Sequence, residues 1–295
     1  MTAGGARRPE HGPARAAVDL AMRVAVGICA VLVVLVLAIS VFQEKLVFLP
    51  PPPPVTQGIG ATRLDFASSP DQPLFAFLVD PSARDSATPR RFVFVLHGNG
   101  DLADSWIDWG RDVADRTGWS VFIPEYRGYG GLPGYPTADG VMQDSRAALH
   151  FLGSKYGAEP DAVVFYAHSL GTGIAAQLAN EAGAKALIME APMTSILAVG
   201  QRNFGPPLSW FLPMISRIDL APIVHVPRVR APVWVAFGNR DEVVPPAMAR
   251  AVYDAAPRKG RLLVVEGAGH NDVGPRGRDS YRAWLDEALL QADQP

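Results

Sequence analysis

The sequence predicts an α/β fold in which a mostly parallel, doubly wound sheet of eight strands is covered by helices on both faces. Short apolar runs alternate with longer amphipathic runs after Gly60, which is typical of successive β-α units. The central runs FVFVL and AVVFY are apolar at every position, as expected for strands that are buried on both faces. Together these observations favour parallel strands joined by crossover helices.

Eight apolar segments are expected to form the strands: residues 62–66, 74–79, 92–96, 120–123, 162–166, 186–189, 233–237 and 261–265. Five amphipathic segments are expected to form helices: residues 102–116, 138–155, 170–182, 246–255 and 276–291. The first two strands follow each other too closely for a crossover helix, so they are expected to pair antiparallel. The later strands are expected to run parallel to one another.

A short insertion after the sixth strand, residues 192–230, interrupts the alternation. It contains too many prolines for one long helix, so we expect short helices and turns. Loops at the carboxyl ends of strands build ligand sites in such sheets, which makes the insertion a candidate cap over a pocket. Its apolar residues Phe204, Leu208, Trp210 and Phe211 either pack the insertion onto the domain, line an acyl pocket or touch a bilayer.

An uncharged apolar run, residues 24–42, precedes the domain. As a helix it is roughly 28 Å long at about 1.5 Å per residue, close to the ~30 Å of a bilayer core. Arginines at positions 7, 8, 15 and 23 precede it, whereas Glu44 and Lys45 follow. The positive-inside rule therefore predicts a single-pass anchor with a cytoplasmic N-terminus and an extracytoplasmic domain. A cleaved signal peptide and a secreted domain are the alternative.

The chain is accordingly divided into an N-terminal tail (1–23), a transmembrane helix (24–42), a proline-rich linker (43–60) and a folded domain (61–295). The single cysteine, Cys29, lies in the apolar run, which excludes an intrachain disulfide, and no Cys/His cluster has zinc spacing. The net charge is −2 and the basic residues are scattered, so nucleic acid is excluded as a partner. The oligomeric state is left open.

The segment YAHSLGTG, residues 166–173, places Ser169 between a predicted strand and a predicted helix. It nearly matches Gly-x-Ser-x-Gly, in which a sharp turn exposes a nucleophilic serine, but Ala167 stands where the first glycine is expected. Side chains two positions before and after the serine crowd each other in such a turn, and alanine adds only one methyl group. A serine that merely caps a helix is the alternative explanation.

One acidic and one basic candidate follow later strands. Asp241 comes just after the seventh strand and His270 lies in a Gly-rich loop after the eighth. The chain order Ser169, Asp241, His270 and their places at the carboxyl ends of strands predict a catalytic triad. Glu190, at the end of the sixth strand, is the reserve candidate for the acid.

A loop that follows the strand FVFVL is the candidate oxyanion-binding element. It reads HGNGD, and its backbone N–H groups can point at a developing negative charge. The N–H groups of Asn99 and Leu170 are expected to form the oxyanion hole. His97 is expected to hold this loop by a hydrogen bond rather than to act as a base.

From Thr62 to its C-terminus the chain resembles the α/β-hydrolase superfamily and, within it, membrane-anchored hydrolase-domain proteins with one N-terminal span. Those proteins carry a similar Q-x-K-L-x-F-x-P exit (residues 43–50), an H-G-N oxyanion loop (97–99), a Y-R-G-Y-G turn (126–130) and a G-x-x-D-x-x-x-P acid loop (238–245). The resemblance implies an α/β-hydrolase fold and a serine hydrolase.

The expected reaction is cleavage of a small-molecule or lipid-derived carboxylic ester through an acyl-enzyme, with no metal or organic cofactor. An ester ranks first among the substrates, a lipid ester or thioester next, and a peptide last. A membrane-tethered binding protein that uses an inactive hydrolase fold is the alternative from another functional class.

Overall fold

One sheet forms the centre of the domain. Its strands are β1 (Thr62–Ser69), β2 (Gln72–Val79), β3 (Phe92–Leu96), β4 (Ser120–Pro124), β5 (Val163–His168), β6 (Ala186–Glu190), β7 (Val233–Gly238) and β8 (Lys259–Val265). The computed structural model describes residues 13–54, 58–85 and 88–294 and places these strands in the order β1-β2-β4-β3-β5-β6-β7-β8. Strands β3 to β8 are parallel, and β2 is antiparallel to both β1 and β4. The predicted sheet is confirmed.

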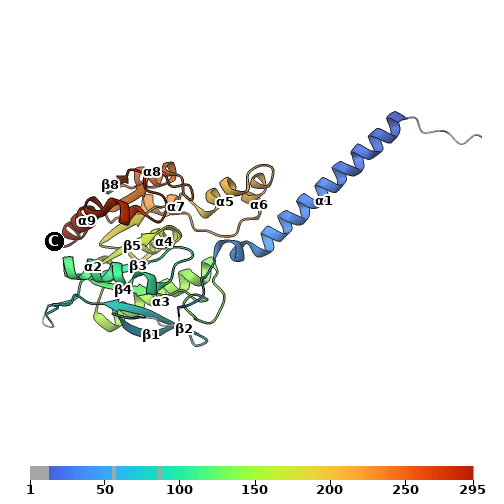
Figure 1. Cartoon of the computed structure of the whole chain (residues 1–295). Helices are drawn as coiled ribbons and strands as arrows, with labels where there is room; N and C mark the ends of the chain where they lie inside the picture. Colours follow the sequence, from blue (N-terminus) through green and yellow to red (C-terminus); the bar gives the residue numbers. More distant parts are fainter. Residues whose placement is uncertain (1–12, 55–57, 86–87, 295) are drawn as a thin grey trace, which may run out of the picture.

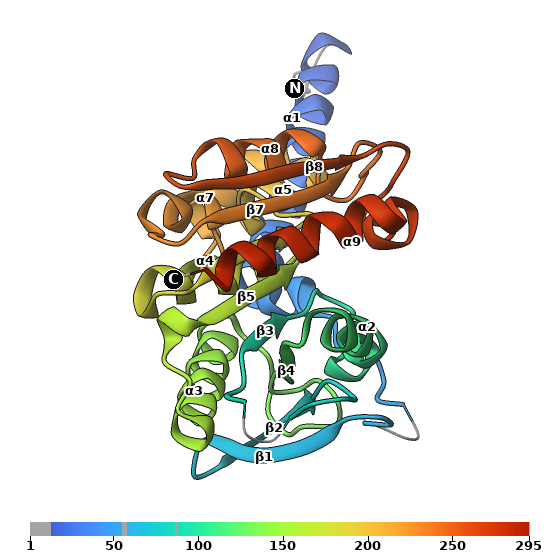
Figure 2. The ribbon, with the colours of Figure 1, turned by 90° about the vertical axis from the view of Figure 1, so that its left-hand side faces the viewer.

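Helices cover both faces of the sheet, which explains why β3, β5 and β6 are buried at every position. The covering helices are α2 (Ile107–Thr117), α3 (Ala138–Tyr156), α4 (Gly171–Ala182), α8 (Pro246–Asp254) and α9 (Val273–Ala292). Residues of α2 and α9 belong to one core cluster, and those of α3, α4 and α8 belong to the other. In Figure 2 the helix α9 runs across the sheet between β5 and β7.

Local sequence signals set the ends of these helices. The side chain of Thr137 accepts a hydrogen bond from the N–H of Gly140 at 3.0 Å and so caps the first turn of α3. The same helix ends at Gly157, whose φ of 68° lies in the left-handed region that glycine enters without a steric penalty. These two signals fix the length of α3, the helix that precedes β5.

The insertion between β6 and β7 is a chain of short helices, as expected. It contains α5 (Ile196–Phe204), α6 (Leu212–Ile215) and α7 (Pro222–His225), with single 3₁₀ turns at Leu208–Trp210 and Val226–Arg228. Leu212 and Leu220 are buried and fasten the insertion to the domain. Trp210 and Met214, by contrast, are 68% and 81% exposed.

A long helix, α1 (Pro13–Val47), projects away from the domain (Figure 1). Its stretch Arg15–Val47 is long and apolar enough to cross a membrane, and the most apolar window of that stretch has no buried residue. The helix is therefore compatible with either a membrane anchor or a signal sequence. Residues 1–12 of the predicted tail lie outside the described residues.

The end of α1 differs from the predicted boundary, because the helix continues through residues 43–47 into the segment expected to be linker. The polar side chains of Gln43 and Glu44 in this segment form hydrogen bonds with the domain. Oε1 of Gln43 accepts a hydrogen bond from the N–H of Arg217 at 2.7 Å, and Glu44 accepts one from Ala138 at 3.2 Å. Phe48 follows and is 1% exposed within the core.

Candidate active site

Ser169 lies at a sharp turn between β5 and α4. Its φ of 50° is positive, which is uncommon for a residue with a side chain and is a form of backbone strain found at functional sites. The turn is held because Ser169 donates its N–H to the carbonyl of Glu190 at 3.0 Å and accepts the N–H of Thr172 at 3.0 Å. This is the strand–turn–helix setting expected for an exposed nucleophile.

The small residues around Ser169 have different reasons to be small. A Cβ atom on Gly171 would lie 2.1 Å from the backbone oxygen of Leu96, so only glycine fits there. Ala167 lies in β5, fully buried, in register with Leu96 on one side and Met189 on the other. The departure from glycine at position 167 is therefore accommodated within a regular strand, whereas the glycine after the serine is obligatory.

His270 connects Ser169 to Asp241. Its Nε2 atom lies 2.7 Å from Oγ of Ser169, and its Nδ1 atom lies 2.7 Å from Oδ2 of Asp241. The side chain of His270 is 10% exposed and that of Asp241 is 1% exposed. The structure thus brings together the three side chains of the predicted triad, from the ends of β5, β7 and β8.

Backbone groups orient the carboxylate of Asp241. Its Oδ1 atom accepts the N–H groups of Val243 at 2.9 Å and Val244 at 2.8 Å, so only Oδ2 faces the imidazole. Because a carboxylate only accepts, Nδ1 of a neutral His270 carries the proton and Nε2 presents its lone pair to the serine hydroxyl. This is the tautomer that a general base requires.

The loop that carries His270 is held against the end of β7. The N–H of Arg240 donates to the carbonyl of Ala268 at 2.9 Å, and Asp272 accepts the N–H of Gly269. A Cβ atom on Gly238 would lie 2.2 Å from the oxygen of Ala268, so the close approach depends on glycine. The Gly-rich composition of both loops is what allows the histidine and the aspartate to meet.

The two expected oxyanion donors lie beside the nucleophile. Asn99 and Leu170 line the same cavity as Ser169 and His270. The side chain of Asn99 also has a role that sequence reasoning missed: its Nδ2 donates to the carbonyl of Val47 at 2.6 Å, and its Oδ1 accepts the N–H of Leu49 at 2.8 Å. The oxyanion loop is therefore tied to the residues at the end of α1.

His97 is fully buried and braces the same loop. Its Nε2 atom lies 2.9 Å from Oε1 of Glu125, and its Nδ1 atom lies 2.9 Å from the carbonyl of Gly98. Burial opposes protonation, but the Glu125 carboxylate more than offsets it, so the pKa of His97 is raised. These contacts match the holding role expected for His97.

His168, the residue before Ser169, contacts the backbone of the loop that carries His270. Its Nε2 lies 3.4 Å from the carbonyl oxygen of His270, and its Nδ1 lies 3.5 Å from Asp101, an ion-pair distance rather than a good hydrogen bond. Burial disfavours the charged form, yet the carboxylates of Asp101 and Glu190 together outweigh this, so the pKa of His168 is raised. No sequence signal pointed to this pair.

The reserve acid, Glu190, has other partners. It is buried and accepts a hydrogen bond from the hydroxyl of Tyr166 at 2.5 Å, and that hydroxyl also lies 2.7 Å from the hydroxyl of Tyr281. Burial, followed by the charge of Glu190, holds the pKa of Tyr166 well above its usual value. His270 is paired with Asp241 and not with Glu190.

A cavity of about 510 Å³ opens over Ser169. Its lining is mostly apolar and includes Met193, Ile196, Val199 and Phe204. Among the described residues that line this cavity none is acidic. Of the four apolar residues expected in a cap, Phe204 reaches the cavity, Leu208 is half-buried outside it, and Trp210 and Phe211 are exposed.

No group of three His, Cys, Asp or Glu side chains converges as a metal site within residues 13–54, 58–85 and 88–294. The arrangement around Ser169 instead offers a nucleophile, a base, an orienting carboxylate and nearby backbone donors. Such a set suits acyl transfer to water.

Comparison with known proteins places the chain in a family. A family model described as serine aminopeptidase, S33, matches residues 87–221. An uncharacterized protein of Mycobacterium tuberculosis (strain H37Rv) is 33% identical over 202 residues, which are 66% of this chain and 70% of that protein. Alpha/beta hydrolase domain-containing protein 17C of Xenopus tropicalis is 31% identical over 195 residues, 64% of this chain and 59% of the frog protein.

The chain belongs to the α/β-hydrolase superfamily. Among solved structures, the esterase Pf2001 of Pyrococcus furiosus superimposes on this hydrolase with a TM-score of 0.66, covering 82% of this chain and 99% of the esterase. The two sequences are 18% identical, so this likeness concerns the fold. The family model and the sequence relatives confirm the predicted superfamily, and the chain is a member of a hydrolase family.

Proposed function

We propose that the protein is a membrane-anchored serine hydrolase that cleaves carboxylic esters through Ser169, Asp241 and His270. The observation that carries the proposal is the continuous chain of contacts from Asp241 through His270 to Ser169, with both distances at 2.7 Å. A hydrogen-bonded serine, histidine and buried carboxylate is the arrangement that activates an alcohol at neutral pH.

The reaction proceeds through an acyl-enzyme. Oγ of Ser169 attacks the ester carbonyl carbon while Nε2 of His270 takes the hydroxyl proton. The N–H groups of Leu170 and Asn99 stabilise the resulting oxyanion, with about 3–4 kcal/mol per donor in comparable enzymes. The intermediate then collapses, the C–O bond to the alcohol breaks, and His270 returns the proton to the departing oxygen.

Water completes the cycle. His270, neutral again, takes a proton from a water molecule that attacks the acyl carbon, and the second tetrahedral intermediate releases a carboxylic acid. Ser169 recovers its proton from His270. Asp241 stabilises the imidazolium in both halves without itself taking the proton.

The lining of the cavity favours an ester over the peptide suggested by the description of the family model. An aminopeptidase must hold the positively charged amino terminus of its substrate, and a carboxylate is the natural partner for that charge. None of the described residues of the cavity is acidic, whereas Met193, Ile196 and Val199 offer apolar surface. An apolar acyl group is the better match for such a lining.

The contacts at the end of α1 support an uncleaved anchor. A signal-peptide cut near Ser40 would remove a bond to the folded domain, because Arg217 donates to the carbonyl of Ser40 at 2.6 Å. Arg15 and Arg23 precede the apolar run, which supports a cytoplasmic N-terminus. Residues 7 and 8, the other two arginines, lie outside the described residues. Fractionation of cells with external protease tests this topology: a shortened, soluble product would contradict it.

Labelling with a fluorophosphonate probe tests the proposed nucleophile. Wild-type protein is expected to label and Ser169→Ala is not, with both proteins showing the same melting temperature. Equal labelling of the two, or labelling of neither, would favour the alternative of an inactive hydrolase fold used as a binding protein. Hydrolysis of p-nitrophenyl butyrate by the same pair provides the matching activity measurement.

A further inference from the structure

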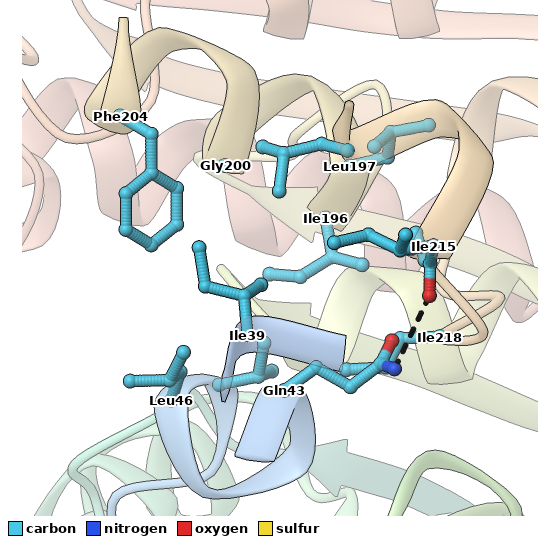
Figure 3. A pocket seen from close by; sticks show the side chains of 12 residues that line it. Ile39, Gln43, Leu46, Ile196, Leu197, Gly200, Phe204, Ile215 and Ile218 are labelled. Atoms are coloured by element: carbon cyan, nitrogen blue, oxygen red, sulfur yellow. Dashed lines mark hydrogen bonds between the residues drawn. The ribbon is translucent and has the colours of Figure 1, made fainter. Parts of the chain in front are cut away.

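A second, narrower pocket lies between the end of α1 and the insertion. It has a volume of about 60 Å³, and its walls include Ile39 and Leu46 from α1 and Leu197 and Phe204 from α5. Figure 3 shows these apolar side chains facing one another across the space between the two helices. Membrane-proximal and domain residues therefore build this pocket jointly.

The polar side chain of Gln43 in this pocket is already satisfied. Its Nε2 donates to the carbonyls of Ser40 at 2.8 Å and Ile215 at 3.3 Å, while its Oε1 accepts the N–H of Arg217 at 2.7 Å. With that amide fully engaged, the pocket presents mainly hydrocarbon to an occupant. A chain of methylene groups is the chemistry that such a surface binds.

The pocket adjoins the cavity above Ser169. Five residues line both spaces, and they come from the end of α1 and from α5: Leu46, Val47, Ile196, Gly200 and Phe204. These shared walls are mostly apolar, so an acyl group whose carbonyl lies at Ser169 would meet hydrocarbon where the cavity and the pocket adjoin. The small volume of the pocket suits an unbranched chain better than a ring.

The pocket also lies at the level where α1 would leave a bilayer. Ile39 belongs to the apolar run of residues 24–42 and is three residues from its end, about 4.5 Å along a helix. Trp210, Phe211 and Met214, at the same insertion, are 68%, 38% and 81% exposed. Exposed apolar and aromatic residues beside a membrane helix are suited to the boundary between lipid and water.

We propose that the pocket between α1 and α5 binds the distal part of an unbranched fatty acyl chain, and that the substrate is a long-chain ester which enters from the bilayer along α1. This inference rests on the proposed esterase function and narrows its substrate class. The membrane helix then acts as one wall of the substrate site in addition to anchoring the domain.

Filling the pocket at Gly200 tests the proposal. A Cβ atom there would lie 3.6 Å from Cδ1 of Leu212, an ordinary contact, so the first atom of a new side chain fits on α5, and the melting temperature reports whether the rest of a leucine does. Full-length protein in detergent micelles is assayed with p-nitrophenyl butyrate and p-nitrophenyl laurate. We expect wild type to prefer laurate in kcat/KM, and Gly200→Leu to lower the laurate-to-butyrate ratio by at least about tenfold.

Two further variants separate a blocked pocket from a damaged fold. Ile39→Trp fills the same pocket from α1, outside both core clusters of the domain, and is expected to lower the ratio in the same direction. Met214→Leu changes an exposed residue of α6 that lines neither space and is expected to leave the ratio as in wild type. Melting temperatures of all variants show whether the domain is folded.

The possible results point to different failures. A wild type with no preference for laurate, or an equal loss on both esters in Gly200→Leu and Ile39→Trp, overturns the acyl-chain site and leaves the esterase intact. Absence of hydrolysis of either ester by wild type, together with absence of fluorophosphonate labelling, overturns the proposed function itself.

Discussion

Replacing Asp241 by asparagine is expected to disable the catalytic base without unfolding the domain. The amide oxygen of the new side chain must take the place of Oδ1, because the N–H groups of Val243 and Val244 point there at 2.9 and 2.8 Å. The amide NH₂ then faces Nδ1 of His270 and can only donate. His270 must therefore move its own proton to Nε2, where it faces Ser169 and cannot accept the hydroxyl proton.

The expected loss in kcat is about 10⁴-fold, as found when the orienting aspartate of a serine protease triad is changed in this way. At about 1.4 kcal/mol for each factor of ten, this corresponds to roughly 5 kcal/mol of transition-state stabilisation. The melting temperature should change little, because the asparagine oxygen keeps both backbone hydrogen bonds. Initial rates with p-nitrophenyl butyrate give kcat, with Ser169→Ala as the background.

Glu190→Gln is the matched control for this experiment. Its hydrogen bond is to Tyr166 and not to His270, so catalysis should be affected far less than by Asp241→Asn. The reasoning is refuted if Asp241→Asn stays within about tenfold of wild type while Ser169→Ala is inactive. A larger loss in Glu190→Gln than in Asp241→Asn would move the role of the acid to Glu190.

Two other changes test the structure around the site. Gly171→Ala should destabilise the fold by more than about 3 kcal/mol, because its Cβ would lie 2.1 Å from the oxygen of Leu96; urea unfolding measures this, and a loss below about 1 kcal/mol would contradict it. The pKa of His168 is raised and that of Asp101 is lowered, so their pairing stabilises the fold most between the ordinary values of 3.8 and 6.5. The stabilisation is lost as the pH rises through the raised pKa of His168, and also as the pH falls through the lowered pKa of Asp101. The difference in melting temperature between wild type and Asp101→Asn should accordingly shrink as the pH rises from below 6.5 through the raised pKa of His168; a difference that stays constant while His168 is seen to lose its proton by NMR titration would exclude this role for the pair.

The sheet was predictable because its signal is local. A strand such as β5, covered on both faces, is expected to be apolar along most of its length, and a sharp turn must follow it where Ser169 faces the cavity. The order of Ser169, Asp241 and His270 along the chain then indicated which strand ends should meet. Their juxtaposition was predicted from that order, and the structure gives the distances.

The contacts of α1 were not predictable by the same means. Gln43 looks like a polar residue at a membrane exit, and its partner Arg217 is 174 positions away in the sequence. The side-chain bonds of Asn99 to Val47 and Leu49 likewise span about fifty residues and leave no periodic pattern. Pairings of this kind depend on how separate elements pack, which single-residue propensities do not encode.

The hydrogen bonds at the end of α1 restrict rotation of the domain relative to this helix. The N–H of Arg217 donates to Gln43 in the helix, and the N–H of Leu49, just after the helix, donates to Asn99, so the chain is bound to the domain on both sides of Phe48. If α1 spans a bilayer, these bonds would hold the opening of the cavity at a nearly constant distance and angle from the lipid headgroups. Encounters would then be governed by lateral diffusion in a plane, and a molecule held far above that plane would stay out of reach.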